Sequence, residues 1–179
     1  MKNINELKEI IENIEIQIQK IKMILNDDGS LNSEDLDFSK KAKAVGVMKE
    51  ESDERIVEGV FDGQKMIGPD GKQYSIPANY ISKSKLVEGD ILKLTIDKGG
   101  NFIYKQIGPV ERDRLVGVLL KSGENGEYVV NVDKSAYKVI LASVTYFKGA
   151  EGDEVIILVP KNTSCQWAAI ENIIKKGSH

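Results

Sequence analysis

The chain has 179 residues, 25 basic and 28 acidic side chains, and a formal net charge of −3. This charge argues against a strongly cationic nucleic-acid-binding protein, whereas the hydrophobic content of 41 % allows a packed core. Because no apolar run reaches about 18 residues and no secretory leader is apparent, we expect a cytoplasmic protein without membrane contact. A single cysteine, Cys165, excludes a disulfide framework within the chain.

Residues 1–25 are predicted to form a helix, since they lack proline and glycine. Isoleucines and leucines recur at alternating spacings of three and four residues, which is the a/d pattern of a coiled coil. The predicted oligomerisation residues are Ile4, Leu7, Ile11, Ile14, Ile18, Ile21 and Leu25. Isoleucine at both a and d favours more than two strands. The alternative is that this helix packs against its own domain.

Residues 26–52 are charged and lack sustained periodicity, so we predict a flexible linker. From residue 53 to residue 160, short apolar runs alternate with turn residues, which is typical of small β-barrels or sandwiches. The predicted strands are Arg55–Phe61, Lys65–Ile67, Gln73–Ile76, Ile91–Ile96, Phe102–Ile107, Leu115–Leu120, Tyr128–Val132, Ala136–Leu141 and Glu154–Val159.

An internal repeat relates the two halves of this β region at an offset of 63 residues. Identical or similar residues then coincide in the same strand phase, as with Gly63 and Gly126, Tyr74 and Tyr137, and the two Glu-Gly-Asp triplets that end at Asp90 and Asp153. We predict a mainly β fold with two tandem barrel-like modules, SH3-like or OB-like, at residues 53–110 and 111–160.

The end of the chain, residues 161–176, is predicted to be a short helix. Thr163 and Gln166 fit a capping box, and Trp167, Ile170 and Ile174 fit one apolar stripe. Residues 177–179 look like a cloning remnant.

The Glu-Gly-Asp triplets are the most tempting catalytic feature, because paired carboxylates can perform acid–base chemistry. Their position before a strand in both repeats favours a structural turn instead, in which Gly89 and Gly152 adopt positive φ and the aspartates accept backbone N–H groups. No phosphate-binding loop, zinc-ligand spacing or nucleophile elbow occurs, and Cys165 is predicted to be packed. We therefore expect no enzyme activity, no small-molecule substrate, no cofactor and no metal site.

Nucleic-acid binding is a further hypothesis, because small β-barrels often bind RNA. Basic side chains outnumber acidic ones by two from residue 61 onward. Aromatic rings beside lysines and arginines can stack on bases and neutralise phosphates. The candidate contacts for RNA or another partner are Lys83, Lys85, Phe102, Tyr104, Lys105, Arg112 and Arg114. The alternative is that the aromatic residues belong to the core and the cations to an ordinary solvated surface.

Five sequence strings carry a resemblance: Glu58–Gly63, Ile76–Tyr80, Ser82–Asp90, Tyr104–Arg112 and Ala142–Gly149. With them, residues 57–176 resemble a family of small proteins from uncultured, reduced-genome bacteria that are often labelled as the large-subunit ribosomal stalk protein. The resemblance implies a link to translation, although a stalk protein ends in an α/β domain and this chain predicts an all-β end.

We therefore expect an oligomeric adaptor that associates with itself through the N-terminal helix and with the ribosome, RNA or other translation or transcription machinery. The alternatives are a protein–protein scaffold without nucleic-acid contact and an enzyme with a site between the two modules.

Overall fold

The computed structural model describes residues 33–51, 53–123 and 125–176, together with Ile11, Ile14 and Ile18. Contacts divide the chain into two compact units, residues 1–37 and residues 38–179. In the first unit, Ile11, Ile14 and Ile18 are helical, with 52, 49 and 45 % of their surface exposed. The other predicted coiled-coil positions and residues 26–32 lie outside the described residues, so the coiled coil stays a prediction. No helix in the described part of the chain is long and apolar enough to cross a membrane.

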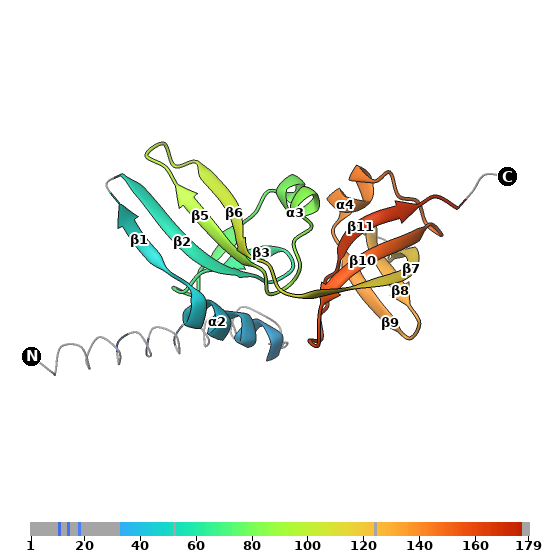
Figure 1. Ribbon diagram of the computed structural model, residues 1–179, viewed down its shortest axis with the longest axis horizontal. Helices are drawn as coiled ribbons and strands as arrows, with labels where there is room; N and C mark the ends of the chain where they lie inside the picture. Colours follow the sequence, from blue (N-terminus) through green and yellow to red (C-terminus); the bar gives the residue numbers. More distant parts are fainter. Residues whose placement is uncertain are drawn as a thin grey trace, which may run out of the picture. The chain divides into compact units, whose positions relative to one another are not determined.

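The second unit contains two antiparallel sheets, which confirms the mainly β prediction (Figure 1). The first has the order β4-β3-β2-β5-β6, with β1 also paired to β2. Between β4 and β5 lies the short helix α3. The bounds are β1 Met48–Glu51, β2 Glu54–Phe61, β3 Lys65–Ile67, β4 Gln73–Ser75, α3 Ala78–Ser84, β5 Ile91–Ile96 and β6 Phe102–Gly108.

The second sheet has the order β11-β10-β7-β8-β9, and the short helix α4 lies between β9 and β10. When β2–β6 are matched with β7–β11, the two sheets have the same strand order. The bounds are β7 Arg112–Ser122, β8 Glu127–Val132, β9 Ser135–Val139, α4 Leu141–Tyr146, β10 Glu154–Pro160 and β11 Ala169–Ile174.

Residues with positive φ recur at the same 63-residue offset as the sequence repeat. Gly89 and Gly152 have φ values of 93° and 90°, and Lys85 and Lys148 have 51° and 53°. Each triplet aspartate accepts a hydrogen bond from the backbone N–H three residues earlier, at 2.8 Å for Asp90 and 2.9 Å for Asp153. The interpretation of the Glu-Gly-Asp triplets as fold-forming turns is therefore confirmed.

Alternating strand residues build a separate core in each sheet. The core on the first sheet includes Val57, Phe61, Met66, Leu92 and Leu94, all almost fully buried. The core on the second sheet includes Leu119, Val130, Val155, Ile157 and Ile170, and Cys165 packs against it as predicted. Side chains at every second strand position enter these cores, because successive residues of a strand point to opposite faces.

The predicted flexible linker is wrong for residues 33–51. This segment forms the helix α2, Ser33–Val45, and the edge strand β1. Ala42 is fully buried and packs against Val60 and Ile67 of the first sheet. At Gly46 a β-carbon would lie only 2.2 Å from the Ala42 carbonyl oxygen. Residues 33–51 are ordered by this close contact with the first sheet. The contact involves few apolar side chains, so the sequence shows no helical periodicity there.

The predicted C-terminal helix is also wrong, because residues 169–174 form β11, which pairs with β10. The second β-rich segment therefore extends past residue 160. The register shifts so that Ile156 pairs with Asn172 while Ile157 pairs with Ile170, which leaves Glu171 as an extra residue. Such a bulge lets side chains three positions apart face the same side of a strand. Ile170 and Ile173 are both buried for this reason, and their spacing resembles that of a helix.

Candidate nucleic-acid interface

Three aromatic rings lie in a row that runs from α3 to the loop end of β6. The ring centroids of Tyr80 and Tyr104 are 6.1 Å apart, and those of Tyr104 and Phe102 are 6.4 Å apart. The Phe102 side chain is 48 % exposed, whereas both tyrosines are half-buried. We call these three residues the aromatic row. Tyr104 is held in place because its hydroxyl donates a hydrogen bond of 2.7 Å to the Ser75 carbonyl oxygen of β4.

Strand register explains why this row is accessible. Tyr104 pairs with Leu94 and Phe102 pairs with Ile96, so both rings share a sheet face with the buried Leu94. Towards the β5–β6 loop the core ends, because Ile96 is only half-buried. Phe102 thus continues the core face into solvent, where a planar ligand can reach its ring.

A charged and hydrogen-bonded cluster borders the same face. Arg55 pairs with Ile96 in the register, and its Nη2 lies 3.8 Å from Oδ2 of Asp70. The Tyr74 hydroxyl donates to the same oxygen at 2.8 Å. Burial, followed by this bond to Asp70, raises the pKa of Tyr74 to about 12. Burial, with a smaller contribution from Tyr74, also raises the pKa of Tyr104 to about 12, so both hydroxyls remain protonated at neutral pH.

Both arginines predicted to contact phosphates have carboxylate partners. Arg112 Nη2 lies 2.7 Å from Oδ1 of the fully buried Asp90 carboxylate. Arg114 forms two hydrogen bonds of 2.6 and 2.8 Å with the carboxylate of Glu171. The bond from Arg114 holds the pKa of Glu171 below its ordinary value. The charge of each arginine is therefore already neutralised nearby.

The predicted lysines lie on different elements of the first sheet. Lys83 is exposed on α3, and the Lys85 carbonyl oxygen accepts a hydrogen bond from Arg112. Lys105 is exposed on the opposite face of β6 from Phe102 and Tyr104, as its position in the strand dictates. The structure thus brings together the two predicted aromatics, with Lys105 on the opposite face of the same strand and Lys83 three residues after Tyr80 on α3.

Sequence reasoning missed Tyr80 and Arg55 at this face. A usable signal was present, since the 63-residue repeat places Ser143 at the position of Tyr80. A large aromatic residue at one copy of a repeat and a small polar residue at the other indicates a position that the shared fold does not dictate.

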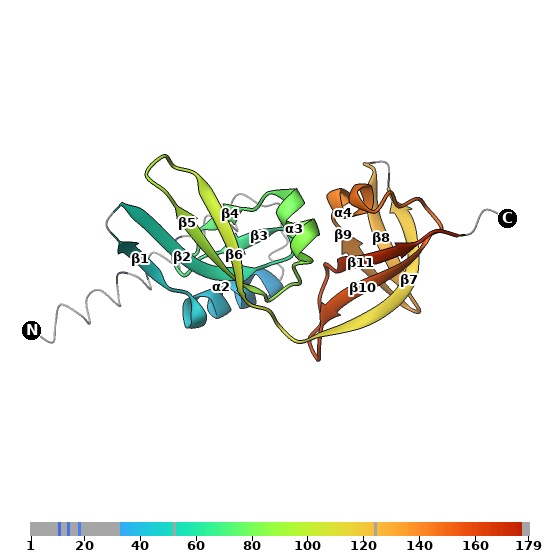
Figure 2. The same cartoon turned by 45° about the horizontal axis from the view of Figure 1, so that its top comes forward.

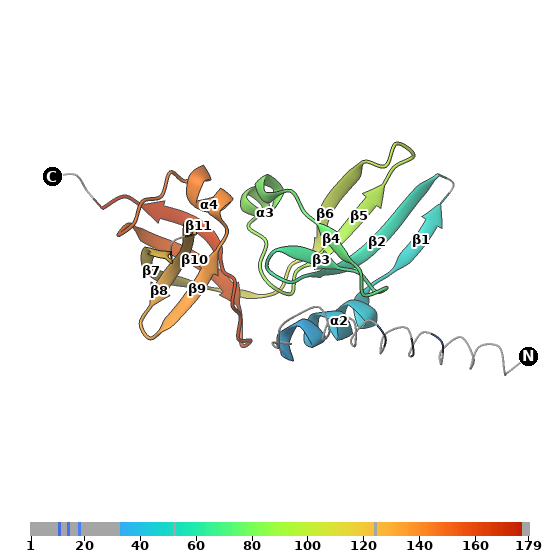
Figure 3. The ribbon, with the colours of Figure 1, turned by 180° about the vertical axis from the view of Figure 1, so that it is seen from behind.

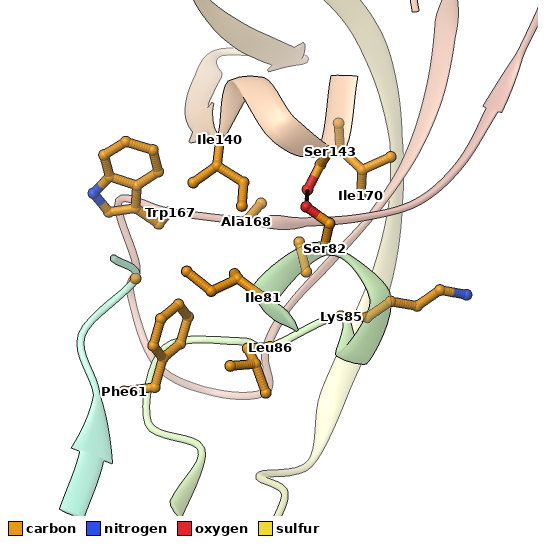
Figure 4. Close-up of a pocket in the computed structure, with 12 residues that line it drawn as sticks. Phe61, Ile81, Ser82, Lys85, Leu86, Ile140, Ser143, Trp167, Ala168 and Ile170 are labelled. Atoms are coloured by element: carbon orange, nitrogen blue, oxygen red, sulfur yellow. Dashed lines mark hydrogen bonds between the residues drawn. The ribbon is translucent and has the colours of Figure 1, made fainter. Parts of the chain in front are cut away.

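A small cavity lies where the two sheets' short helices meet, and Figures 2 and 3 show α3 beside α4. The buried Ser143 hydroxyl donates to the Ser82 hydroxyl at 3.1 Å, and Trp167 and Ile140 lie on another side (Figure 4). Glu88 joins this junction by accepting hydrogen bonds from the backbone N–H groups of Gln166 and Trp167. With a volume of about 10 Å³, the cavity has room for about one water molecule and is a packing feature, not a ligand site.

Comparison with protein-family models finds no match to this chain, and comparison with curated proteins finds no match either.

Proposed function

We propose that this chain is a non-enzymatic, oligomeric binding protein whose two sheets are tandem OB-like barrels and whose aromatic row binds single-stranded RNA. The half-exposed Phe102, next to Tyr104 and Tyr80, is the observation that carries the proposal. Successive aromatic rings are the platform on which single-stranded nucleic acids stack, with little dependence on base identity.

The strand order supports an OB-like barrel. In each sheet the first strand lies in the middle, between the second and the fourth, and a short helix connects the third to the fourth. In the second sheet a parallel bridge between Lys138 and Trp167 joins the third strand to the segment before the fifth. OB folds are partly open Greek-key barrels that bind oligonucleotides beside the loop between strands four and five. Phe102 directly follows the corresponding loop of the first sheet.

The ion pairs define how this binding would respond to salt. Because Arg112 and Arg114 are paired with Asp90 and Glu171, these two cations are less able to displace counterions from phosphates. Stacking would then supply most of the affinity. We expect the logarithm of the affinity to fall with the logarithm of salt concentration with a slope of about −1 or shallower.

The test is fluorescence anisotropy of a labelled single-stranded pyrimidine RNA with the full chain and two variants. Phe102→Ala removes an exposed ring of the row, and we expect a loss of affinity of about tenfold or more, since one stacked base contributes about 1–3 kcal/mol. Ile103→Ala is the matched control, because Ile103 is the next residue on β6, is 57 % exposed and faces the other side. Equal affinities for both variants and the parent, or no RNA binding by the parent, would reject the aromatic row.

Self-association through the N-terminal helix is the second part of the proposal. The helical Ile11, Ile14 and Ile18 are about half-exposed, and a helix with such a stripe needs a partner to bury it. Replacing all three with aspartate should convert an oligomer into a monomer in sedimentation-velocity experiments. A deletion for the same purpose should end before Ser33, because α2 begins there. A monomeric parent chain would contradict this part.

The link to translation rests on the resemblance of residues 57–176 and on RNA binding. We expect the full chain to co-sediment with ribosomal subunits and the Phe102→Ala variant to do so less. Absence of the parent chain from the ribosomal fractions would reject this link while leaving the RNA-binding test unaffected.

A further inference from the structure

The first sheet ends in a long strand with a free side. β6 pairs with β5, and no other strand within the described residues pairs with it (Figure 2). In the second sheet the corresponding side is partly used, because the backbone N–H of Ala168 donates to the Lys138 carbonyl and the N–H of Lys138 donates to the Gln166 carbonyl. In the first sheet, a side-chain bond from Tyr104 to Ser75 spans the corresponding gap.

The hydrogen-bond phase shows which backbone groups of β6 face the free side. The Asp97 N–H donates to the Asn101 carbonyl, so the pairs Thr95–Ile103 and Lys93–Lys105 also exchange hydrogen bonds, since such pairs alternate along an antiparallel ladder. The other edge of β5 is consistent with this alternation. The Phe61 N–H donates to the Asp90 carbonyl, so the even-numbered residues of this segment direct their backbone groups towards β2 and the odd-numbered ones towards β6. The backbone N–H and C=O groups that point outward therefore belong to Phe102, Tyr104 and Gln106.

The outer face of this edge combines apolar and basic side chains. Ile103 is 57 % exposed and the exposed Lys105 follows it on the same face, whereas Ile107 is the extra residue of a register shift and does not continue the alternation. Lys105 pairs directly with Lys93 of β5, and Lys93 pairs in turn with Glu58 of β2, so Lys105 ends this row of charges with a like charge as its neighbour on β5. Like charges in directly opposed positions are unfavourable, and an acidic residue on an added strand would relieve them.

We propose that β6 binds an extended segment of a partner protein as an additional strand, with an acidic side chain opposite Lys105 and an apolar side chain opposite Ile103. Outward-pointing backbone groups supply the hydrogen bonds, and the alternating side chains supply the preference for sequence. A second copy of β6 fits less well, because an antiparallel pairing of all its seven residues places Lys105 opposite itself.

The test uses synthetic fluorescent peptides of about nine residues, long enough to cover β6. The probe alternates valine and threonine around a central glutamate. One control peptide has lysine in place of the glutamate, and another has methylated backbone nitrogens at alternate positions, so that it cannot donate hydrogen bonds along one edge. Anisotropy titrations with the full chain should show binding of the glutamate peptide, binding at least about threefold weaker for the lysine peptide, and none for the methylated peptide.

Charge exchange completes the experiment. Lys105→Glu should reverse the preference so that the lysine peptide binds more tightly than the glutamate peptide. Lys134→Glu makes the same charge change in an exposed turn of the second sheet and should leave the preference unchanged. No binding of the glutamate peptide by the parent, equal binding of the methylated peptide, or an unchanged preference in Lys105→Glu would each overturn the proposal. None of these measurements involves RNA, so their failure is distinct from failure of the aromatic row.

Discussion

Asp90 is the position where a single substitution should destabilise the fold most clearly. Its fully buried carboxylate accepts hydrogen bonds from the backbone N–H groups of Val87 and Val110, the Gln106 side chain and the Arg112 guanidinium, at 2.7–2.9 Å. Asp90→Ala leaves these donors without their acceptor. Arg112 retains its bonds to two backbone carbonyls, so its charge is not wholly unpaired.

The expected loss in the free energy of unfolding is about 4 kcal/mol, since removing one partner of a buried ion pair typically costs about 3–5 kcal/mol. The repeat supplies a matched control. Asp153 occupies the same turn in the second sheet, but its side chain is 9 % exposed and its bonds of 2.9, 3.2 and 3.4 Å to Ala150, Lys175 and Lys176 are longer. Asp153→Ala should cost about 1–2 kcal/mol.

Urea unfolding followed by circular dichroism and by the fluorescence of Trp167, the chain's single tryptophan, measures both losses. Trp167 reports on the junction between α3 and α4, so it also shows whether the two sheets unfold together. Equal losses at Asp90 and Asp153, or a loss below about 1 kcal/mol at Asp90, would refute the argument that burial and four donors distinguish the two turns.

Two further predictions concern a pair of glycines related by the repeat and two tyrosines whose pKa is raised by burial. Gly63→Ala should lower the midpoint of thermal unfolding more than Gly126→Ala does. A β-carbon at Gly63 would lie 2.6 Å from the Trp167 ring, whereas a β-carbon at Gly126 would meet nothing within 4 Å. Equal decreases in the midpoint would contradict this prediction. Spectrophotometric titration should show Tyr74 and Tyr104 ionising near pH 12, and Tyr74→Phe and Tyr104→Phe should each remove one late step. The folded pKa values exceed the ordinary value of about 10, so the unfolded chain binds fewer protons than the folded chain between pH 10 and 12. These two tyrosines therefore make the free energy of unfolding fall as the pH rises through that window. Ionisation of all tyrosines near pH 10 would contradict the stated burial.

The sequence predicted the strands between Glu54 and Pro160 closely, because most of them bury alternate side chains and end at a turn residue, but it did not predict the short helices α3 and α4 between them. Failures occurred where order depends on contacts that leave no period in the sequence. In α2 a single fully buried residue, Ala42, provides much of the docking. In β11 the bulge at Glu171 gave isoleucines a helical spacing.

In the candidate site, too, some features follow from local sequence patterns and others depend on contacts between distant parts of the chain. The faces of Phe102, Tyr104 and Lys105 follow from strand alternation and could be predicted. The carboxylate partners of Arg112 and Arg114 could not, because Glu171 is 57 residues from Arg114 and reaches it only through the pairing of β11 with β10 and of β10 with β7. Counting charges along the sequence does not reveal that such an arginine is paired with a carboxylate in the fold.

Both proposed binding surfaces lie on β6 for one physical reason. Two sheets with the same strand order have the same gap between their third and fifth strands, and the second sheet fills it with the Lys138–Trp167 bridge, while Trp167 also packs against Gly63. The first sheet has no backbone bridge there within the described residues, so Phe102 of its fifth strand is left exposed and the outward backbone groups of that strand have no strand partner, while Tyr104 is half-buried and bonds to Ser75 across the gap. The segment before the last strand therefore spans this gap with backbone hydrogen bonds in the second sheet, whereas in the described part of the first sheet only the Tyr104 side chain does so.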